Sequence, residues 1–337
     1  MKRRSTWPHR GSLTWRAQTE WTESVWDTEA SVTERDDVVE VINTVGTGLT
    51  DPHIRIFNDR AYLYASHDHS ADSTDFVLKD WQVWSSDDLL NWEQESVLRP
   101  EDTYIGKPTD GCWATDAVEH KDRYYWCFSE VDKPADFYQI GIVESESPGG
   151  PWTDKLGGPL IPNGLVDTPC YDPCLFKEDD GSIYILFGIW DYYIVRVSDD
   201  MRTIETPRPI EVRNPRGPYG EGKTDDKVFL HKRNGIYYLS WGSYYATSET
   251  LDGPYTYRGC IVDPDLMEPR FRERTWPHGP TQGRHGAFFE WRDAWYFVYC
   301  EMCFSNNRYF RDFWISHLSY ADDGSMEPIT IDSKSIT

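Results

Sequence analysis

Five segments of the chain repeat one pattern, and this self-similarity constrains the fold more than any other feature. Each segment starts at a polar residue, continues into a short apolar strand, and passes through a tight turn into an aromatic strand. Turns such as Asn58-Asp59 and Asn234-Gly235 are typical of β-hairpins. The leading residues recur at intervals of 54 to 65 residues: Asp51, Asp116, Asp172, Asp226 and His285. The repeat therefore predicts five similar units built from antiparallel strands.

Several of these units continue into further strands, as residues 81–85 and 87–92 do in the first. Four strands repeated five times predict an all-β fold, a five-bladed β-propeller with four-stranded antiparallel blades. A β-sandwich would also have many short strands, but it would not explain a polar residue at one phase of every repeat. We assign the propeller to residues 46–337. Residues 1–45 form an N-terminal extension that could be a cap, a strand closing the last blade, or the arm of a homodimer.

The charge of the chain excludes two classes of partner. There are 57 acidic and 34 basic residues, which give a formal net charge of −23. Such a surface repels nucleic acid and anionic membranes. The acidic residues are spread along the sequence, so they do not indicate a disordered acidic tail. Spread acid suits a high-salt cytoplasm, and we expect a halophilic protein that loses stability or activity in low-salt buffer.

The cysteines and the N-terminus indicate the compartment. The seven cysteines show no repeated spacing, and Cys300 and Cys303 form a single CxxC. Free thiols in a reducing compartment are the expectation, because one CxxC without a second is weak evidence for zinc. No apolar run follows the basic N-terminus, and no stretch approaches the ~18 apolar residues of a membrane helix. We therefore expect a cytoplasmic protein.

The leading residues carry the functional prediction. The first strand of each propeller blade lines the central axis, so four aspartates and one histidine should converge on one funnel. A single aspartate before a strand is usually a turn residue. A phased set is different, because clustered carboxylates repel one another and raise each other's pKa values. Such a cluster suits general acid and base catalysis at a glycosidic bond, or metal binding.

Motifs around these positions resemble those of glycoside hydrolase family 43. They are Thr-Asp-Pro-His-Ile at residues 50–54, Ser-His-Asp at 66–68, Trp-Ala-Thr-Asp at 113–116, Tyr-Asp-Pro-Cys-Leu-Phe at 171–176 and His-Lys-Arg-Asn-Gly-Ile-Tyr-Tyr-Leu-Ser at 231–240. The resemblance runs from about residue 48 to residue 329. It implies a five-bladed propeller that cleaves xylosides or arabinofuranosides with inversion.

The resemblance also implies roles for single residues. Asp51 would be the general base that activates water, and Asp172 would orient the general acid and tune its pKa. His285 would hold a calcium ion or an ordered water at the axis, so Ca²⁺ is the expected cofactor. Contacts with substrate are expected from three residues: Trp113, Asp116 and Arg311. Trp113 would be a stacking platform for a sugar ring, or it would pack between blades.

The general acid departs from the family pattern. The family has a glutamate followed by a small residue and a proline, whereas this chain has Asp226 followed by Lys227. Asp226 would then be the acid, kept protonated by Asp172 and Asp116. Asp225 or Glu221 could reach the site instead, or hydrolysis could be lost. Strand alternation predicts that Lys227 points away from the site.

The predicted function is exo-acting, inverting glycoside hydrolysis of short oligosaccharides, catalysed by Asp51, Asp172 and Asp226. A β-xyloside, an α-L-arabinofuranoside and a galactose-type sugar remain open as substrates. The alternative is a non-catalytic sugar-binding propeller that has lost the acid. A metal-dependent lyase or phosphoesterase is a third class, disfavoured because the ring contains a single histidine.

Overall fold

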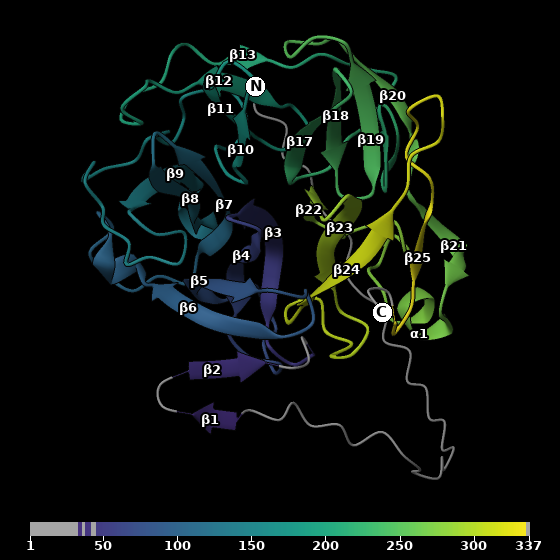
Figure 1. Cartoon of the computed structure of the whole chain (residues 1–337), viewed down its shortest axis with the longest axis horizontal. Helices are drawn as coiled ribbons and strands as arrows, with labels where there is room; N and C mark the ends of the chain where they lie inside the picture. The colour runs from purple at the N-terminus through teal and green to yellow at the C-terminus, as the bar shows by residue number, and fades with distance from the viewer. Residues whose placement is uncertain (1–32, 36–37, 42–44, 335–337) are drawn as a thin grey trace, which may run out of the picture.

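The repeats form five antiparallel sheets in a computed structural model of the protein, which describes residues 33–35, 38–41 and 45–334. The sheets surround a central axis as five blades (Figure 1). The inner strands are β3 (Leu49–Phe57), β7 (Cys112–His120), β10 (Cys174–Lys177), β17 (Val228–Arg233) and β22 (Gly286–Trp291). They contact one another in this order, and β22 returns to β3. The predicted five-bladed propeller is confirmed.

The outer strands differ from blade to blade. Blade one adds β4 (Arg60–Asp68), β5 (Leu78–Ser86) and β6 (Trp92–Leu98); blade two adds β8 (Arg123–Asp132) and β9 (Phe137–Ser145); blade three adds β11 (Ile183–Phe187), β12 (Tyr193–Arg196) and β13 (Arg208–Pro209); blade four adds β18 (Ile236–Trp241), β19 (Tyr244–Ser248), β20 (Tyr255–Cys260) and the parallel β14 (Val212–Arg213); blade five adds β23 (Ala294–Glu301) and β24 (Asp312–Leu318).

In the described part of the chain, blades two and five are three-stranded sheets. Isolated bridges from β9 to Thr153 and Ile161 replace the fourth strand expected in blade two. Pro151 and Pro162 lie close to these bridges in the sequence, and a proline has no backbone N–H to donate to a strand ladder.

Tight turns set the register between inner and second strands. Asn58 and Asp59 have φ of 52° and 63°, and Phe57 pairs with Arg60 across them. Two consecutive residues with positive φ characterise the type I′ turn, whose twist matches that of the flanking strands. Asn, Asp and Gly tolerate this conformation best. The predicted hairpin turns are therefore confirmed.

The chain before blade one joins that blade on its outer edge. β1 (Thr33–Arg35) pairs with β2 (Val38–Val41), and β2 pairs with β6. Most of the predicted extension, residues 1–45, lies outside the described residues. The ring is fastened between blades five and one by Asp312, whose carboxylate accepts hydrogen bonds from the backbone N–H groups of Gly46, Thr47 and Gly48.

The remaining elements are short. A hairpin of β15 (Arg216–Gly217) and β16 (Gly220–Glu221) precedes blade four, and β21 (Val262–Met267) pairs with β25 (Ile329–Ile331). Helical segments are η1 (Pro100–Asp102), η2 (Lys133–Ala135) and α1 (Pro269–Glu273). No helix of the described residues has the length and apolar character needed to cross a membrane.

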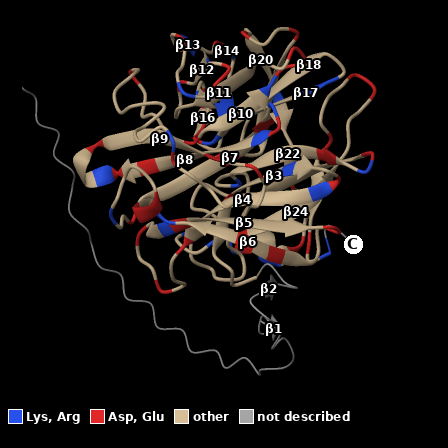
Figure 2. Ribbon diagram, turned by 60° about the vertical axis from the view of Figure 1, so that its left-hand side comes forward, with Lys and Arg blue, Asp and Glu red and all other residues tan. Residues whose placement is uncertain are grey.

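Acidic residues are distributed over the loops and strands of the propeller (Figure 2). All seven cysteines are free thiols, and six of them are buried. The expectation of unpaired buried cysteines is therefore confirmed for all except Cys260, which is half-buried.

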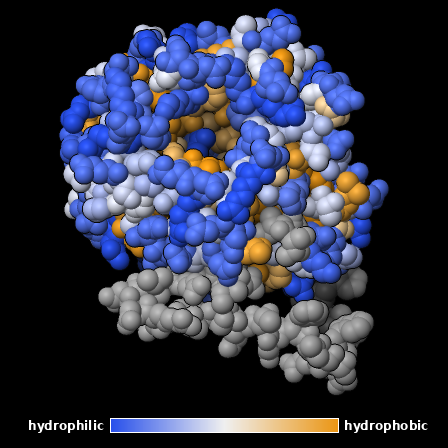
Figure 3. All heavy atoms as spheres, viewed as in Figure 1, coloured by the Kyte–Doolittle hydropathy of each residue, from blue (hydrophilic) through white to orange (hydrophobic). Residues whose placement is uncertain are grey.

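The propeller axis holds a cavity at each end. A cavity of about 480 Å³ lies beside the starts of β3, β17 and β22, and another of about 460 Å³ lies at the opposite ends of the inner strands. The hollow in the centre of Figure 3 has hydrophobic residues on its wall and a hydrophilic residue at its centre. Three polar residues with no exposed surface fill the axis between the cavities: His53, Asp116 and Lys227. The two cavities are thus separate, and each is blind.

Candidate active site

Asp51 and Asp172 enter the first cavity through the same local bend. Their φ angles are 48° and 57°, and the ladder of β3 is irregular between Thr50 and His53. Aspartate tolerates this left-handed conformation better than most residues. Both carboxylates line the cavity, as predicted from their phase in the repeat. Lys227, with φ of 57°, occupies the corresponding position before β17.

Asp51 is surrounded by donors. Its Oδ1 accepts a hydrogen bond from Nη1 of Arg311 at 3.1 Å, and its Oδ2 accepts one from the hydroxyl of Ser66 at 3.2 Å. Its backbone N–H donates to the sulfur of Cys300. Burial by itself raises the pKa of Asp51, but Arg311 and His285 outweigh burial and hold this pKa far below its ordinary value. The carboxylate is therefore ionised, as a general base must be.

His285 stands between two carboxylates. Its Nδ1 lies 3.3 Å from Oδ1 of Asp51, and its Nε2 lies 2.5 Å from Oδ1 of Asp226. The second contact is an ion pair without hydrogen-bond geometry. Burial by itself lowers the pKa of His285, but Asp226 and Asp51 raise it well above its ordinary value. The imidazole is thus a proton-holding bridge between the two predicted catalytic groups.

Asp226 is the one of the three proposed acids that reaches the cavity. Glu221 is exposed in the β15–β16 hairpin and forms an ion pair with Arg216. Asp225 lies behind Asp226 and accepts a hydrogen bond from its backbone N–H. Asp225 does not line the cavity, although burial, together with Asp226, raises its pKa to about 8. Geometry therefore favours Asp226.

The proton expected on Asp226 lies elsewhere in the free protein. Burial raises the pKa of Asp226, but the neighbouring His285 lowers it below its ordinary value. The prediction that Asp172 and Asp116 keep Asp226 protonated is therefore wrong. The Asp226–His285 pair holds one proton as a unit, and it lies mainly on the imidazole.

Asp172 is a neutral carboxyl at mildly acidic pH. Burial, assisted by the charge of Asp226, raises the pKa of Asp172 to about 7. Its Oδ2 accepts a hydrogen bond from the backbone N–H of Lys227 at 3.0 Å. This bond ties Asp172 to the residue that follows Asp226. The role of Asp172 in orienting the acid, which the family resemblance implied, stays a prediction.

We expect Asp172→Asn to stabilise the fold increasingly as pH rises. When the pKa of a carboxyl is raised in the folded state, the folded protein loses stability as pH rises from the ordinary pKa of the group to its folded pKa, here about 7. Each pKa unit corresponds to about 1.4 kcal/mol. The gap in Tm between variant and wild type should widen from pH ~4 to pH ~7 and then stay constant, measured by calorimetry. Asp122→Asn, in an exposed turn, is the control. A difference in Tm between Asp172→Asn and wild type that does not change with pH would contradict the raised pKa of Asp172.

Arg311 lines the cavity, and a second carboxylate fixes it. Asp68 accepts hydrogen bonds from the backbone N–H, Nε and Nη2 of Arg311 at 2.7 to 3.0 Å. Asp68 comes from the Ser-His-Asp motif, for which the sequence had suggested no role. The guanidinium therefore spans Asp51 and Asp68, with one edge toward the cavity.

Asp116 does not reach the cavity. It lies well inside β7, deeper along the axis than Asp51, and its side chain has no exposed surface. Its carboxylate accepts hydrogen bonds from Arg55 and from the backbone N–H of Leu175, and it lies 2.7 Å from Nδ1 of His53. The prediction that Asp116 contacts substrate is therefore corrected: this carboxylate joins blades one, two and three below the site.

Trp113 lines the cavity, but its ring is partly covered. The ammonium of Lys133 lies 4.3 Å from the centre of the indole, and Tyr171 packs edge-on against the ring. A sugar therefore cannot stack on the face that Lys133 covers. Trp190, whose exposed fraction is 42 %, also lines the cavity, and its ring is in a T-shaped contact with Tyr219. The sequence prediction missed it because it lies in the connection between β11 and β12, and such connections differ in length from blade to blade.

A metal ion has one candidate donor group among the described residues. The ligand atoms of Asp225, Asp226 and His285 lie within 4.8 Å of one another. Two of these residues also form the ion pair described above, so the metal and the ion pair compete for the same atoms.

Comparisons with known proteins identify one family over most of the chain. Residues 42–326 match the sequence model of Glycosyl hydrolases family 43. A xylosidase/arabinosidase of Bacteroides ovatus is 28% identical, with 86% of this chain and 96% of that protein aligned. A β-xylosidase of Xylanibacter ruminicola is 24% identical, with 83% and 96% aligned.

Solved structures are similar over the whole propeller. The RS223 β-xylosidase has a TM-score of 0.68 at 25% identity and covers 84% of this chain and 96% of its own. A β-xylosidase/α-arabinofuranosidase from a compost metagenome, solved with xylotriose in a calcium-free form, has a TM-score of 0.70 at 26% identity and covers 89% and 98%. The family model spans most of the sequence, and these similar proteins are glycosidases. The chain belongs to glycosyl hydrolase family 43.

Proposed function

We propose that the protein removes a terminal β-xylosyl or α-L-arabinofuranosyl residue from short oligosaccharides with inversion. The observation that carries this proposal is the placement of Asp51 and Asp226 on opposite sides of one imidazole in a blind cavity. Inverting glycosidases keep their two carboxyl groups about 6.5–9.5 Å apart, so that water fits beside the sugar. Two carboxylates held apart by a ring suit this arrangement. The names of the similar proteins support the choice of sugar, and a galactose-type sugar is the remaining alternative.

The reaction is a single displacement. Asp51 accepts a proton from water as the water oxygen bonds to the anomeric carbon. The glycosidic bond breaks on the opposite face, and the leaving oxygen takes the proton held by the Asp226–His285 pair. Asp226 delivers this proton and His285 replaces it, so the pair ends with one proton fewer and Asp51 with one more. Asp172 orients Asp226 through Lys227.

Exo action follows from the shape of the cavity. Its floor is closed by Asp51 and Asp172 and by the buried residues beneath them. A chain end can enter such a cavity, whereas the middle of a polysaccharide cannot pass through it. Trp190 stands at the exposed side, where the next sugar of the chain would lie.

A panel of 4-nitrophenyl glycosides tests the function. We expect cleavage of the β-D-xyloside or the α-L-arabinofuranoside, and the first sugar released should have the opposite anomeric configuration by ¹H NMR. Xylotriose or arabinotriose should yield the monosaccharide from its non-reducing end. Silence over the whole panel would favour the alternative, a sugar-binding propeller, although Asp226 is present to supply the acid which that alternative lacks.

We propose that His285 positions carboxylates and does not bind calcium. Both of its ring nitrogens already contact carboxylates. Calcium takes six to eight oxygen ligands, and in this group it would compete for Asp226 with the proton that has to be donated. The predicted Ca²⁺ therefore does not fit together with the acid.

We also propose a cytoplasmic setting with high salt. The excess of acidic residues and the free thiols support this proposal. Full stability and activity in low-salt buffer would contradict the high-salt part of it.

A further inference from the structure

Lys227 is a fully buried lysine at the centre of the propeller. Its exposed fraction is 0 %, and its ammonium donates a hydrogen bond to the backbone carbonyl of Asp51 at 3.0 Å. Its backbone N–H binds the carboxylate of Asp172. Lys227, from blade four, therefore contacts blades one and three, which supply Asp51 and Asp172.

The backbone conformation and the burial of Lys227 both carry a free-energy cost. Its φ of 57° lies in the left-handed region, which favours glycine. Burial of an ammonium is unfavourable unless neighbouring charges compensate it. A small residue would avoid both costs. The side chain is therefore expected to contribute something that the site requires.

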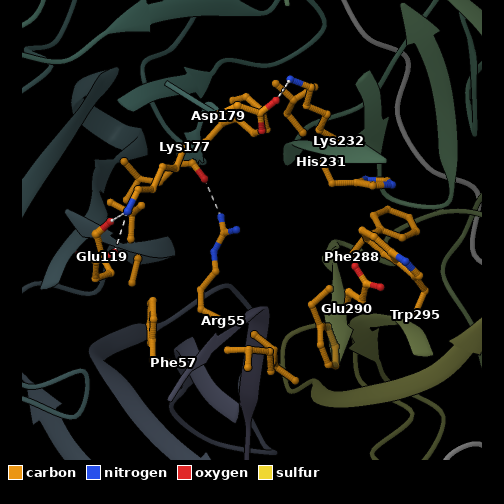
Figure 4. Close-up of a pocket in the computed structure, with 18 residues that line it drawn as sticks. Arg55, Phe57, Glu119, Lys177, Asp179, His231, Lys232, Phe288, Glu290 and Trp295 are labelled. Atoms are coloured by element: carbon orange, nitrogen blue, oxygen red, sulfur yellow. Dashed lines mark hydrogen bonds and ion pairs between the residues drawn. The ribbon is translucent and has the colours of Figure 1, made fainter. Parts of the chain in front are cut away.

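Charges of opposite sign surround the ammonium. On the side of the first cavity it attracts the carboxylates of Asp51 and Asp172. On the other side lie His53 and Asp116, and Asp116 is paired with Arg55. Arg55 reaches the centre of the opposite cavity, where Lys177 and Lys232 are turned toward acidic residues of the wall (Figure 4). Lys227 is thus a third cation close to the catalytic carboxylates, in addition to His285 and Arg311.

We propose that the ammonium of Lys227 is the built-in axial cation of this site, so that the site needs no bound metal ion. This inference rests on the proposed function, because it assigns Lys227 as a positioning residue for Asp51 and Asp172. The ammonium fixes the backbone of Asp51, and its charge balances carboxylates that would otherwise repel one another at close range. A resident metal ion would add positive charge to a site that already has the cations Lys227, Arg311 and His285.

The test uses the full-length protein, as purified for elemental analysis and stripped with EDTA for the measurements of Tm and activity. We expect the wild type to contain no stoichiometric metal by elemental analysis, to keep its Tm when Ca²⁺ is added, and to keep its activity. Lys227→Met retains the volume without the charge and should lower kcat/KM at least tenfold. Lys227→Gly accepts the positive φ and opens the axis, and methylammonium should restore part of its activity. Lys232→Met, in an ion pair at the far cavity, is the matched control and should behave as the wild type.

Three results would overturn the inference: stoichiometric metal in the wild type, a rise in Tm or activity with Ca²⁺, or unchanged kcat/KM in Lys227→Met. Failure of Lys227→Gly to respond to methylammonium would likewise contradict a role for the charge. Metal content and Tm need no substrate, so they test the axial cation even if no glycoside is cleaved. Absence of all cleavage by a metal-free and a calcium-loaded wild type would instead contradict the proposed function.

Discussion

Asp51→Asn is expected to lower kcat/KM by about 10³-fold, within the range of about 10²–10⁴ that general acid–base catalysis contributes. Arg311 and His285 keep the pKa of Asp51 far below its ordinary value, so the wild-type group is entirely in its base form at neutral pH. Asparagine keeps the shape and can still accept hydrogen bonds from Arg311 and Ser66, but it cannot take a proton from water. The rate of release of 4-nitrophenolate measures the loss.

The control for this variant is Asp116→Asn. Asp116 is also a buried aspartate at the axis with an arginine partner, but it lies outside the cavity. We expect Asp116→Asn to lower Tm, because Arg55 loses its charged partner, and to leave kcat within a few-fold of wild type. A near-normal kcat/KM in Asp51→Asn, or an equal loss in the two variants, would contradict the assignment of Asp51 as the base.

Asp51 and Asp172 could be predicted because both follow one local rule. Each precedes a proline, lies within two residues of the first residue of an inner strand and adopts a positive φ, so the repeat aligned equivalent positions. Asp116 broke the alignment because it lies inside β7, beyond the irregularity of the β7 ladder between Trp113 and Thr115. A sequence repeat shows which strand a residue belongs to, but one or two residues decide whether it lies in the cavity or beneath it.

Lys227 shows where strand alternation fails. Alternation predicts the direction of a side chain only within a regular extended strand. Lys227 stands before the first residue of β17, and its positive φ reverses the expected direction. Its side chain therefore enters the axis. A lysine in place of the usual small residue was the available signal, and it could have been interpreted as a buried charge.

The walls of the cavity could not be predicted from the repeat. Phe76, Lys133 and Trp190 come from connections that differ in length between blades, and their contacts depend on tertiary packing. Lys133 illustrates this, since its ammonium lies over Trp113 from a loop about twenty residues away. The repeat thus predicted the catalytic carboxylates better than the residues that select the sugar.

The second large effect is expected for Asp226→Ala, and it should depend on the leaving group. A sugar alkoxide leaves only when its oxygen is protonated, whereas nitrophenolate leaves without a proton. We expect kcat/KM for xylobiose or arabinobiose to fall by about 10³-fold, and that for the 4-nitrophenyl glycoside to fall much less. The comparison of the two substrates, by sugar release and by absorbance, isolates proton donation from binding.

Asp225→Asn is the matched control for Asp226→Ala. Burial raises the pKa of Asp225 to about 8, so this group holds a proton at neutral pH, but it lies behind Asp226 and outside the cavity. If a raised pKa alone defined the acid, Asp225→Asn would lose activity on disaccharides. If access to the leaving oxygen defines the acid, only Asp226→Ala would lose this activity. We expect the second result, because a proton that cannot reach the glycosidic oxygen contributes nothing, whereas His285 can supply one to Asp226 at 2.5 Å. A leaving-group dependence in Asp225→Asn and none in Asp226→Ala would reverse the assignment.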